Sequence, residues 1–303
     1  MKAIKKYIDV VRYGKASTRD VVKEGDIISI TEKVDGANAS FTKDDDNFLG
    51  VSCYSRRQTL TPENTLQGFY GWVRENIVPI KEKLIPNFRY YGEWMTPHKI
   101  KYKEEHKKTF KLFSIWDDNS GQYLSDDIVL IEAKRLGLDT VEYFYRGEFI
   151  SYEHIASFIG KSNITEVPDT GEGIVVKNVS YFNRSGDQVF VKLVSEAFAE
   201  IQKQKLPKNP NIYDKEVAII KSVLTKPRVD KLMHKLVDEG EISREDFSLD
   251  NMIKFIRLLA PRVIEDIYKE ESEILSQLEE AQVKKFVGKV LPPTIKEVLK
   301  DYE

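Results

Sequence analysis

The sequence of 303 residues contains one cysteine, Cys53. A single thiol excludes an internal disulfide and a metal centre built from several cysteines, which fits a reducing compartment. No apolar run approaches the length needed to cross a bilayer, and residues 1–15 lack the apolar core of a signal peptide. We therefore expect a cytoplasmic protein that makes no membrane contact. A phage or virus could also encode such a chain and produce it in its host's cytoplasm.

A strong excess of either charge is also absent. There are 47 basic and 49 acidic residues, with a formal net charge of -2, so nucleic-acid binding would need a local basic patch. The composition, 41% hydrophobic and 32% charged, is ordinary for a globular protein, and no repeat or low-complexity tract is evident. The length predicts two domains, with one large domain as the alternative.

The hydrophobic pattern changes near residue 195. Before it, strand-like runs alternate with turns and short helical segments, whereas after it apolar residues recur at helical spacing. We predict an α+β domain over 1–205, a linker over 206–211 and a small all-α domain over 212–303. Near the end of the chain, Pro292-Pro293-Thr294 is predicted to open a short last helix.

A segment rich in lysine, residues 98–111, is the best local candidate for contact with a nucleic-acid backbone. Tyr102 and Phe110 are interleaved with its lysines, and this mixture suits phosphates and base faces. A solvated loop is the alternative. His98 and His106 have no metal-ligand spacing with carboxylates, so we assign them no chemistry.

The most informative stretch is Lys33-Val34-Asp35-Gly36. A strand-like run precedes it and another follows, so Lys33 lies where a strand gives way to a turn. In a partly dry pocket the pKa of such a lysine falls, and the neutral amine becomes a nucleophile. For this short motif alone, a solvated lysine beside a tight hairpin is the alternative.

Four strand-like segments carry charges that burial normally forbids. They are Glu32 to Gly36, Tyr91 to Glu93, Glu172 to Lys177 and Val189 to Leu193. Buried charges cost free energy unless they pair or bind a ligand. A site for a metal-bound, multiply charged phosphate would satisfy all of them.

The order of these motifs resembles the covalent nucleotidyltransferases, the superfamily of ATP-dependent DNA and RNA ligases and mRNA capping enzymes. Five motifs occur in the family's order between about residues 27 and 195: Lys33-Val34-Asp35-Gly36, Tyr91-Gly92-Glu93, Phe110 to Ile115, Glu172 to Lys177 and Val191-Lys192-Leu193. The chain looks most similar to the nick-sealing RNA ligase 2 family, because Asn38 follows the first motif and a helical tail, rather than a β-barrel, follows the fifth. The resemblance implies a nucleotidyltransferase domain of antiparallel sheets flanked by helices, followed by a small all-α domain that binds RNA.

The family's chemistry implies an ATP-dependent RNA ligase that joins 3′-OH and 5′-phosphate ends, at nicks in duplex RNA. Lys33 resembles the nucleophile that attacks the α-phosphate of ATP, expels pyrophosphate and holds AMP as lysyl-AMP. The AMP then passes to the 5′-phosphate of RNA, and a 3′-hydroxyl displaces it. Mg²⁺ or Mn²⁺ is the expected metal, and a monomer is expected. A DNA or mixed-strand ligase of the same superfamily and a non-catalytic RNA-binding relative are the alternatives.

Five further residues resemble family residues that act beside the nucleophile. Asp35 belongs to the first motif, and Asn38 would help place the terminal hydroxyl and the metal. Glu172 would bind the metal or its water. Lys177 and Lys192 would contact ATP and neutralise its phosphates, as positioned cations do for developing charge.

Another set resembles residues that hold the nucleotide. Glu32 would adjoin adenine largely through its backbone, Phe113 would stack on adenine and Glu93 would hold the ribose. Arg56 would meet the ribose or a phosphate. Arg57 is the alternative, since the alignment is uncertain by one position.

The chain departs from the family's pattern at three positions. Asp35 stands where the nick-sealing branch often has His, and Ser114 stands where Asp is common. Val194 stands where a second lysine is usual, and on a strand it faces the same side as Lys192, so the site would lose one cation.

The spacing of Glu172 and Lys177 raises a geometric question. An odd separation points them to opposite faces of a regular strand. Either a bulge at Gly173 realigns them, or Glu172 precedes the strand.

Overall fold

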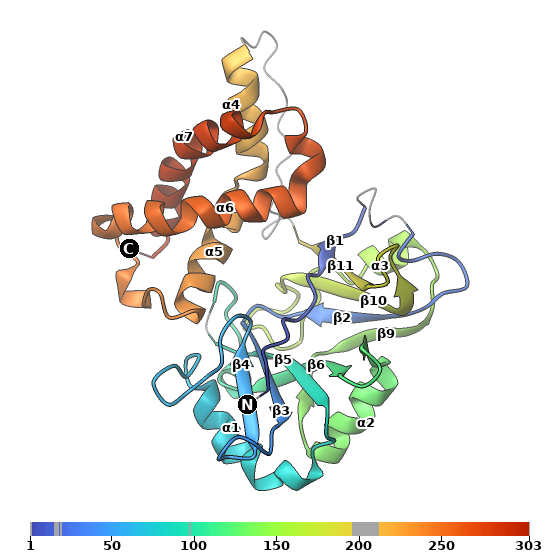
Figure 1. The fold of residues 1–303 in the computed structure, drawn as a ribbon. Coiled ribbons are helices and arrows are strands. Elements are labelled where there is room, and N and C mark those ends of the chain that lie inside the picture. Colours follow the sequence, from blue (N-terminus) through green and yellow to red (C-terminus); the bar gives the residue numbers. More distant parts are fainter. Residues whose placement is uncertain (1, 15–17, 19, 97, 196–211, 303) are drawn as a thin grey trace. The chain divides into compact units, whose positions relative to one another are not determined.

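The computed structural model describes residues 2–14, 18, 20–96, 98–195 and 212–302. The chain forms two compact units, residues 1–195 and 196–303 (Figure 1). Each unit has its own apolar core. The predicted linker, residues 206–211, lies outside the described residues. The α+β class predicted from the sequence is confirmed, because the first unit mixes sheets with helices and the second contains helices.

One sheet of the first unit has five strands in the order β1-β11-β10-β2-β9. They are β1 (Val11–Arg12), β11 (Gln188–Val194), β10 (Gly173–Phe182), β2 (Ile27–Lys33) and β9 (Tyr143–Glu148). All neighbours are antiparallel except β1 and β11. Alternate residues, including Ile30, Ile174 and Val191, pack with Ile155 of helix α3 (Tyr152–Ala156) in a buried core. The opposite face of the sheet carries Lys33, Lys177 and Lys192 of the motifs.

The second sheet has six strands in the order β4-β3-β5-β6-β7, with β8 paired to β6. They are β4 (Val51–Ser55), β3 (Ala37–Lys43), β5 (Phe88–Trp94), β6 (Phe110–Asp117), β7 (Gln122–Tyr123) and β8 (Asp139–Thr140). Helices α1 (Phe69–Asn76) and α2 (Asp126–Leu136) bury Phe69 and Val129 in the apolar core of this sheet. Short 3₁₀ helices span Val78–Lys83 and Glu104–His106.

A cluster of aromatic side chains joins the two sheets. Tyr91 and Phe113 of the second sheet, Phe190 of the first and Tyr7 of the N-terminal segment belong to one buried cluster. The ring centroids of Tyr7 and Phe113 lie 4.8 Å apart, and those of Tyr7 and Tyr91 lie 5.3 Å apart. Such edge-to-face and tilted pairs stabilise a core beyond their buried area. The cluster therefore fixes the two sheets so that their polar faces meet.

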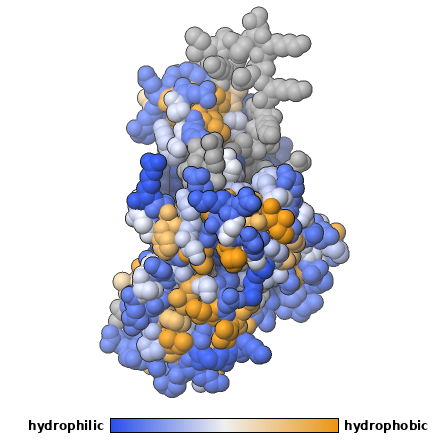
Figure 2. All heavy atoms as spheres, turned by 90° about the vertical axis from the view of Figure 1, so that its right-hand side faces the viewer, coloured by the Kyte–Doolittle hydropathy of each residue, from blue (hydrophilic) through white to orange (hydrophobic). Residues whose placement is uncertain are grey.

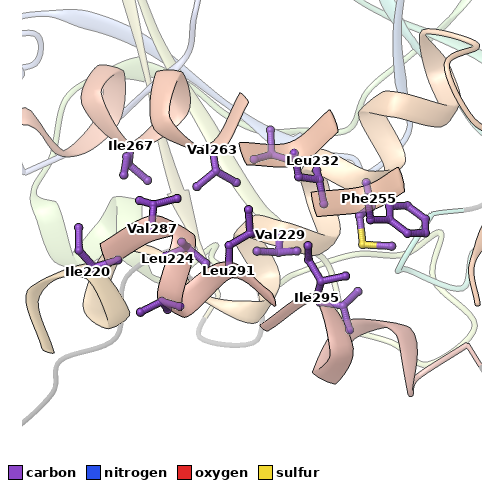
Figure 3. Packing of buried hydrophobic residues seen from close by; sticks show 14 of the residues in the cluster. Ile220, Leu224, Val229, Leu232, Phe255, Val263, Ile267, Val287, Leu291 and Ile295 are labelled. Carbon is purple, nitrogen blue, oxygen red and sulfur yellow. The ribbon is translucent and has the colours of Figure 1, made fainter. Parts of the chain in front are cut away.

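Over its described residues, 212–302, the second unit is a bundle of four helices. They are α4 (Ile212–Val223), α5 (Lys226–Asp238), α6 (Met252–Leu275) and α7 (Glu280–Leu299), with 3₁₀ turns at Arg244–Asp246 and Leu249–Asn251. Their apolar faces interdigitate in one core (Figure 3). The prediction of a separate helix opening at Pro292 is wrong, since α7 runs through Pro292 and Pro293. Proline inside a helix costs free energy because it removes a backbone hydrogen bond and clashes with the preceding turn. Burial of Leu291 and Ile295 in the core offsets this cost.

The surface carries scattered apolar groups. On the face shown in Figure 2, hydrophobic side chains are interspersed with hydrophilic ones. Single exposed apolar residues are normal and indicate no docking site by themselves. No helix within the described residues is both long and apolar enough to cross a membrane.

Candidate active site

Strand pairing places Lys33 on the polar face, at the end of β2. Lys33 of β2 pairs with Gly173 of β10, which pairs in turn with Val194 of β11. Residues directly opposite each other share a face of the sheet. Lys192 lies on the same face one row away, as its spacing from Val194 predicted. A valine therefore stands in the row of Lys33, where the family resemblance expects a lysine.

The amine of Lys33 is held by a carboxylate. Its Nζ donates to Oε2 of Glu172 at 2.6 Å, and the two side chains are 25% and 12% exposed. Burial is the largest single influence and lowers the pKa of Lys33, but the attraction and hydrogen bond of Glu172, together with the charge of Glu93, outweigh it, so the net pKa is raised. The lowered pKa predicted from the sequence is therefore wrong for the protein without ligand. A protonated amine is no nucleophile, so the amine must lose a proton before it attacks.

Glu172 reaches Lys33 because it lies outside the strand. Strand β10 begins at Gly173, and its pairing with β2 and β11 is regular as far as Lys177. The alternative of a bulge at Gly173 is therefore wrong. A Cβ at Gly173 would lie 2.1 Å from the carbonyl oxygen of Leu193. Only glycine permits the close approach of backbones that brings Glu172 to the site.

Glu93 approaches the same amine from the second sheet. It lies on β5 opposite Asn38 of β3, so both side chains share a face. Burial raises the pKa of Glu93 to about 8, against the opposing effect of Lys33. Burial raises the pKa of Glu172, and the charges of Lys33 and Lys192 oppose that rise. The charge of Lys192 also opposes the rise in the pKa of Lys33. The structure thus brings Lys33, Glu93, Glu172 and Lys192 together.

Lys177 is not part of this group. It lies on β10 four residues beyond Gly173, and its side chain is 2% exposed. Its ammonium donates to Oδ1 of Asp126 at 2.9 Å and to the carbonyl oxygen of Phe113. The charge of Lys177 is therefore already balanced by Asp126.

Asp126 was not singled out from the sequence. Besides Lys177, it accepts hydrogen bonds from the hydroxyls of Ser29 and Tyr143. It opens helix α2, and an acid in a first helical turn is common, so its sequence context gave no sign of this role. One buried carboxylate thus connects α2 with strands β2, β9 and β10.

Asp35 organises the loop that follows β5. Its carboxylate accepts the backbone N–H groups of Lys99 and Ile100 at 3.0 and 3.2 Å, and it lies 3.2 Å from Nδ1 of His98. The N–H of Asp35 donates to the hydroxyl of Tyr102 at 2.7 Å. His98, to which the sequence assigned no chemistry, therefore lies beside the first motif.

The lysine-rich segment 98–111 is only partly available for phosphates. Lys103 donates to the carbonyl oxygen of Asn163, whereas Lys107 and Lys111 pair with acidic residues. Lys99, Lys101 and Lys108 are exposed. Three of the six lysines in this segment, Lys103, Lys107 and Lys111, thus stabilise local structure. For these three, the structure agrees with the alternative of a loop that does not bind nucleic acid.

The residues predicted to contact the nucleotide come from both sheets and from the turn after β4. Phe113 shares the aromatic cluster with Val175 of the polar face. Arg56 forms an ion pair with Asp9 of the N-terminal segment, another residue that the sequence did not indicate. Glu32 donates its backbone N–H to the carbonyl oxygen of Glu142 at 2.9 Å.

The side chain of Glu32 lies on the face of β2 opposite Lys33. It is 2% exposed, and burial raises its pKa to about 7, although Ser162 and Lys111 oppose the shift. The contact of the Glu32 backbone with the nucleotide stays a prediction.

Within the described residues, no group of three or more His, Cys, Asp or Glu side chains could hold a metal ion. Glu93 and Glu172 nevertheless lie near Lys33, and burial raises the pKa of both because it penalises their charged forms. A divalent cation would relieve that cost, so the donor set fits a metal that takes its remaining ligands from phosphate and water.

Comparison with known proteins places this site in a family. A scan of protein-family models matches the RNA ligase family over residues 26–194, which spans all five motifs. The chain therefore belongs to the RNA ligase family. A search of curated proteins found no match.

Several solved structures of a Naegleria gruberi RNA ligase are similar to the chain. One, a lysine-to-alanine mutant with ATP and Mn, shares 21% identity at a TM-score of 0.48, over 64% of this chain and 57% of that chain. Another, with pyrophosphate, shares 22% identity at a TM-score of 0.47, with the same coverage. The chain thus covers 57% of the length of these ligases.

Proposed function

We propose that the chain is an ATP-dependent RNA ligase that seals nicks between 3′-OH and 5′-phosphate ends in duplex RNA. The observation that carries the proposal is the convergence of Glu93, Glu172 and Lys192 on the amine of Lys33, in a member of the RNA ligase family. In the first step, the Lys33 nitrogen bonds to the α-phosphorus of ATP and the bond to pyrophosphate breaks. The AMP then moves to the RNA 5′-phosphate, and the 3′-hydroxyl displaces it.

The proton of Lys33 needs an acceptor in this step. Oε2 of Glu172 lies 2.6 Å from Nζ and is therefore placed to accept this proton. Alternatively, Glu172 would give up its hydrogen bond to Lys33 and so free the amine. A divalent cation such as Mg²⁺ or Mn²⁺, held by Glu172 directly or through water, would neutralise phosphate charge when bound. The similar Naegleria ligase was solved with ATP and Mn, which supports this choice.

The cations have different proposed roles. Lys192 lies one row from Lys33 and would neutralise the ATP phosphates. Lys177 is already paired with Asp126 and donates to the carbonyl oxygen of Phe113. It would instead hold Phe113, on which adenine would stack, in position. Arg56 would meet the ribose or a phosphate, and Glu93 the ribose. Asn38, opposite Glu93, would help to place the terminal hydroxyl.

Residues 212–303 are proposed to bind the RNA duplex. Their four helices have a separate apolar core, and no titratable group of the site lies in this part of the chain.

Two assays test the proposal. Incubation with ATP labelled in the α-phosphate should label the protein, and Lys33→Ala should abolish the label; an unlabelled wild type would instead favour a non-catalytic RNA-binding relative. Nicked duplexes with RNA or DNA on the 3′-OH side should show faster sealing of RNA. Equal or faster sealing of DNA would favour a DNA or mixed-strand ligase.

A further inference from the structure

The turn that follows Lys33 is held by a tyrosine from a distant part of the chain. Strand β2 ends at Lys33, and residues 34–36 pair with no strand of the described structure before β3 begins. In the middle of this turn, the backbone N–H of Asp35 donates to the hydroxyl of Tyr102 at 2.7 Å. On its other side the turn packs against β5, because a Cβ at Gly36 would lie 2.6 Å from a backbone oxygen of that strand. The turn is thus fixed between the end of β5 and the Tyr102 hydroxyl.

Tyr102 is itself fixed through its backbone. Its chain neighbours on both sides form backbone hydrogen bonds of 2.9 and 3.0 Å with residues 164–166, and Tyr102 pairs with Thr165 in an isolated bridge. From this second segment the chain runs on to Glu172, the carboxylate that accepts a hydrogen bond from the Lys33 amine. Tyr102 therefore connects the turn after Lys33 with the segment that leads to the partner of its amine.

The Tyr102 hydroxyl stays protonated. The residue is only 2% exposed. Burial raises the pKa of Tyr102 well above its ordinary value, and the charges of Asp35, Glu172 and Glu32 add to this rise, whereas the hydrogen bond from Asp35 opposes it. A neutral phenol is no base for the proton of Lys33, but its oxygen can accept a hydrogen bond from a backbone N–H. A buried ring also offers no face to a base, so contact with nucleic acid does not explain this tyrosine.

We propose that Tyr102 is a positioning residue for the first step of the reaction: its hydroxyl fixes the turn after Lys33, so that the amine can reach both Glu172 and the α-phosphate of ATP. This inference rests on the proposed function and adds to it a residue that touches no substrate. Misplacement of a reacting group by about 1 Å can slow a reaction about a hundredfold. A turn that shifts when its N–H loses its partner should therefore slow the attack. The affinity for ATP should be kept, because residues of other segments are proposed to hold adenine and ribose.

The variant Tyr102→Phe removes only the hydroxyl. The ring keeps its packing, and the carboxylate of Asp35 still accepts the N–H groups of Lys99 and Ile100. We therefore expect the segment around Tyr102 to stay docked, while the turn after Lys33 loses the acceptor of its backbone N–H.

The chain offers a matched control in Tyr90. This tyrosine is also fully buried, and its hydroxyl also accepts a backbone N–H, that of Ile85 at 3.3 Å. Its ring lies in the apolar core of the second sheet. Tyr90→Phe therefore removes a similar hydrogen bond at a place that does not hold the turn after Lys33.

The experiment compares two single-turnover reactions of the full chain. The first is formation of lysyl-AMP from ATP labelled in the α-phosphate, without RNA. The second is sealing of a nicked RNA duplex whose 5′-phosphate already carries AMP, without ATP; it bypasses the attack by Lys33 and reports whether the variant is folded. Tyr102→Phe should lower the maximal rate of the first reaction about tenfold to a hundredfold, with the ATP concentration for half-maximal rate unchanged. It should seal the adenylated nick as fast as the wild type, and Tyr90→Phe should match the wild type in both reactions.

Four results would overturn the role of Tyr102. Tyr102→Phe could form lysyl-AMP at the wild-type rate, or it could slow both reactions by the same factor, which would indicate a general loss of structure. A rise only in the ATP concentration for half-maximal rate would make Tyr102 an ATP-binding residue, and an equal slowing in Tyr90→Phe would show that any buried hydroxyl has this effect. A wild type that takes no label would instead refute the proposed function, which separates that failure from all four.

Discussion

Replacing Asp126 by alanine would leave the buried ammonium of Lys177 without its counter-charge. The two side chains are 8% and 2% exposed, so water cannot replace the missing carboxylate. Removal of one partner of a buried ion pair costs about 3–5 kcal/mol. For a unit of this size, about 2–4 °C is lost per kcal/mol, so we expect the melting temperature of Asp126→Ala to fall by roughly 10 °C.

The measurements are thermal unfolding, which gives the melting temperature, and unfolding in urea, in which the midpoint is compared at unchanged slope. Both are followed by a signal from the first unit. Glu82→Ala serves as the control, because it breaks the exposed pair of Glu82 with Lys43 and should leave the midpoint unchanged. Adding Lys177→Met to Asp126→Ala removes the uncompensated charge and should recover most of the lost stability. The assignment of Asp126 and Lys177 as a buried ion pair would be refuted if Asp126→Ala were as stable as the wild type. It would also be refuted if the double variant recovered none of the lost stability.

Three further predictions concern the catalytic unit. Val194→Lys, which returns a cation to the row of Lys33, should raise the single-turnover rate of self-adenylylation; a slower rate would count against the assigned face. Glu32→Gln should stabilise the protein at pH 8 by on the order of 3 kcal/mol and much less at pH 5. The pKa of the Glu32 carboxyl is about 7 when folded, so wild-type stability is fully present below the unfolded pKa and is lost as the pH rises through 7. A stability difference that does not change with pH would contradict this cause. Truncation after residue 206 should spare lysyl-AMP formation and weaken nick sealing, with a reduced salt dependence of RNA binding; sealing at full rate by the truncated chain would disprove an RNA-binding role for the second unit.

The order of the motifs along the chain predicted that Lys33, Glu93, Glu172 and Lys192 lie near one another. Lys177, which was predicted with them, is paired with Asp126 instead. Strand runs ending in Lys33 and Glu93 imply that both lie at strand ends, and the pairing of β2 with β10 then brings Glu172 to Lys33. The α+β class and the helical tail followed from hydrophobic periodicity alone. These features depend on local pattern, which a single sequence contains.

Other features depend on contacts between distant segments. The pKa direction of Lys33 is decided by the balance between burial and Glu172, and a sequence does not show how close that carboxylate lies. Asp126 and Lys177 are 51 residues apart, and nothing in either neighbourhood marks them as partners. In α7, packing of the bundle overrides the local signal of Pro292 and Pro293. Local rules thus fail where tertiary contacts supply the larger free energy.

The most direct test of the account is to locate the AMP. The full-length protein is incubated with ATP labelled in the α-phosphate, digested, and its labelled peptide is sequenced. We predict that the label resides on Lys33, forms without RNA, and is discharged when a nicked RNA duplex is added. A label on another residue, or one that persists in Lys33→Ala, would contradict the assignment of Lys33 as the nucleophile.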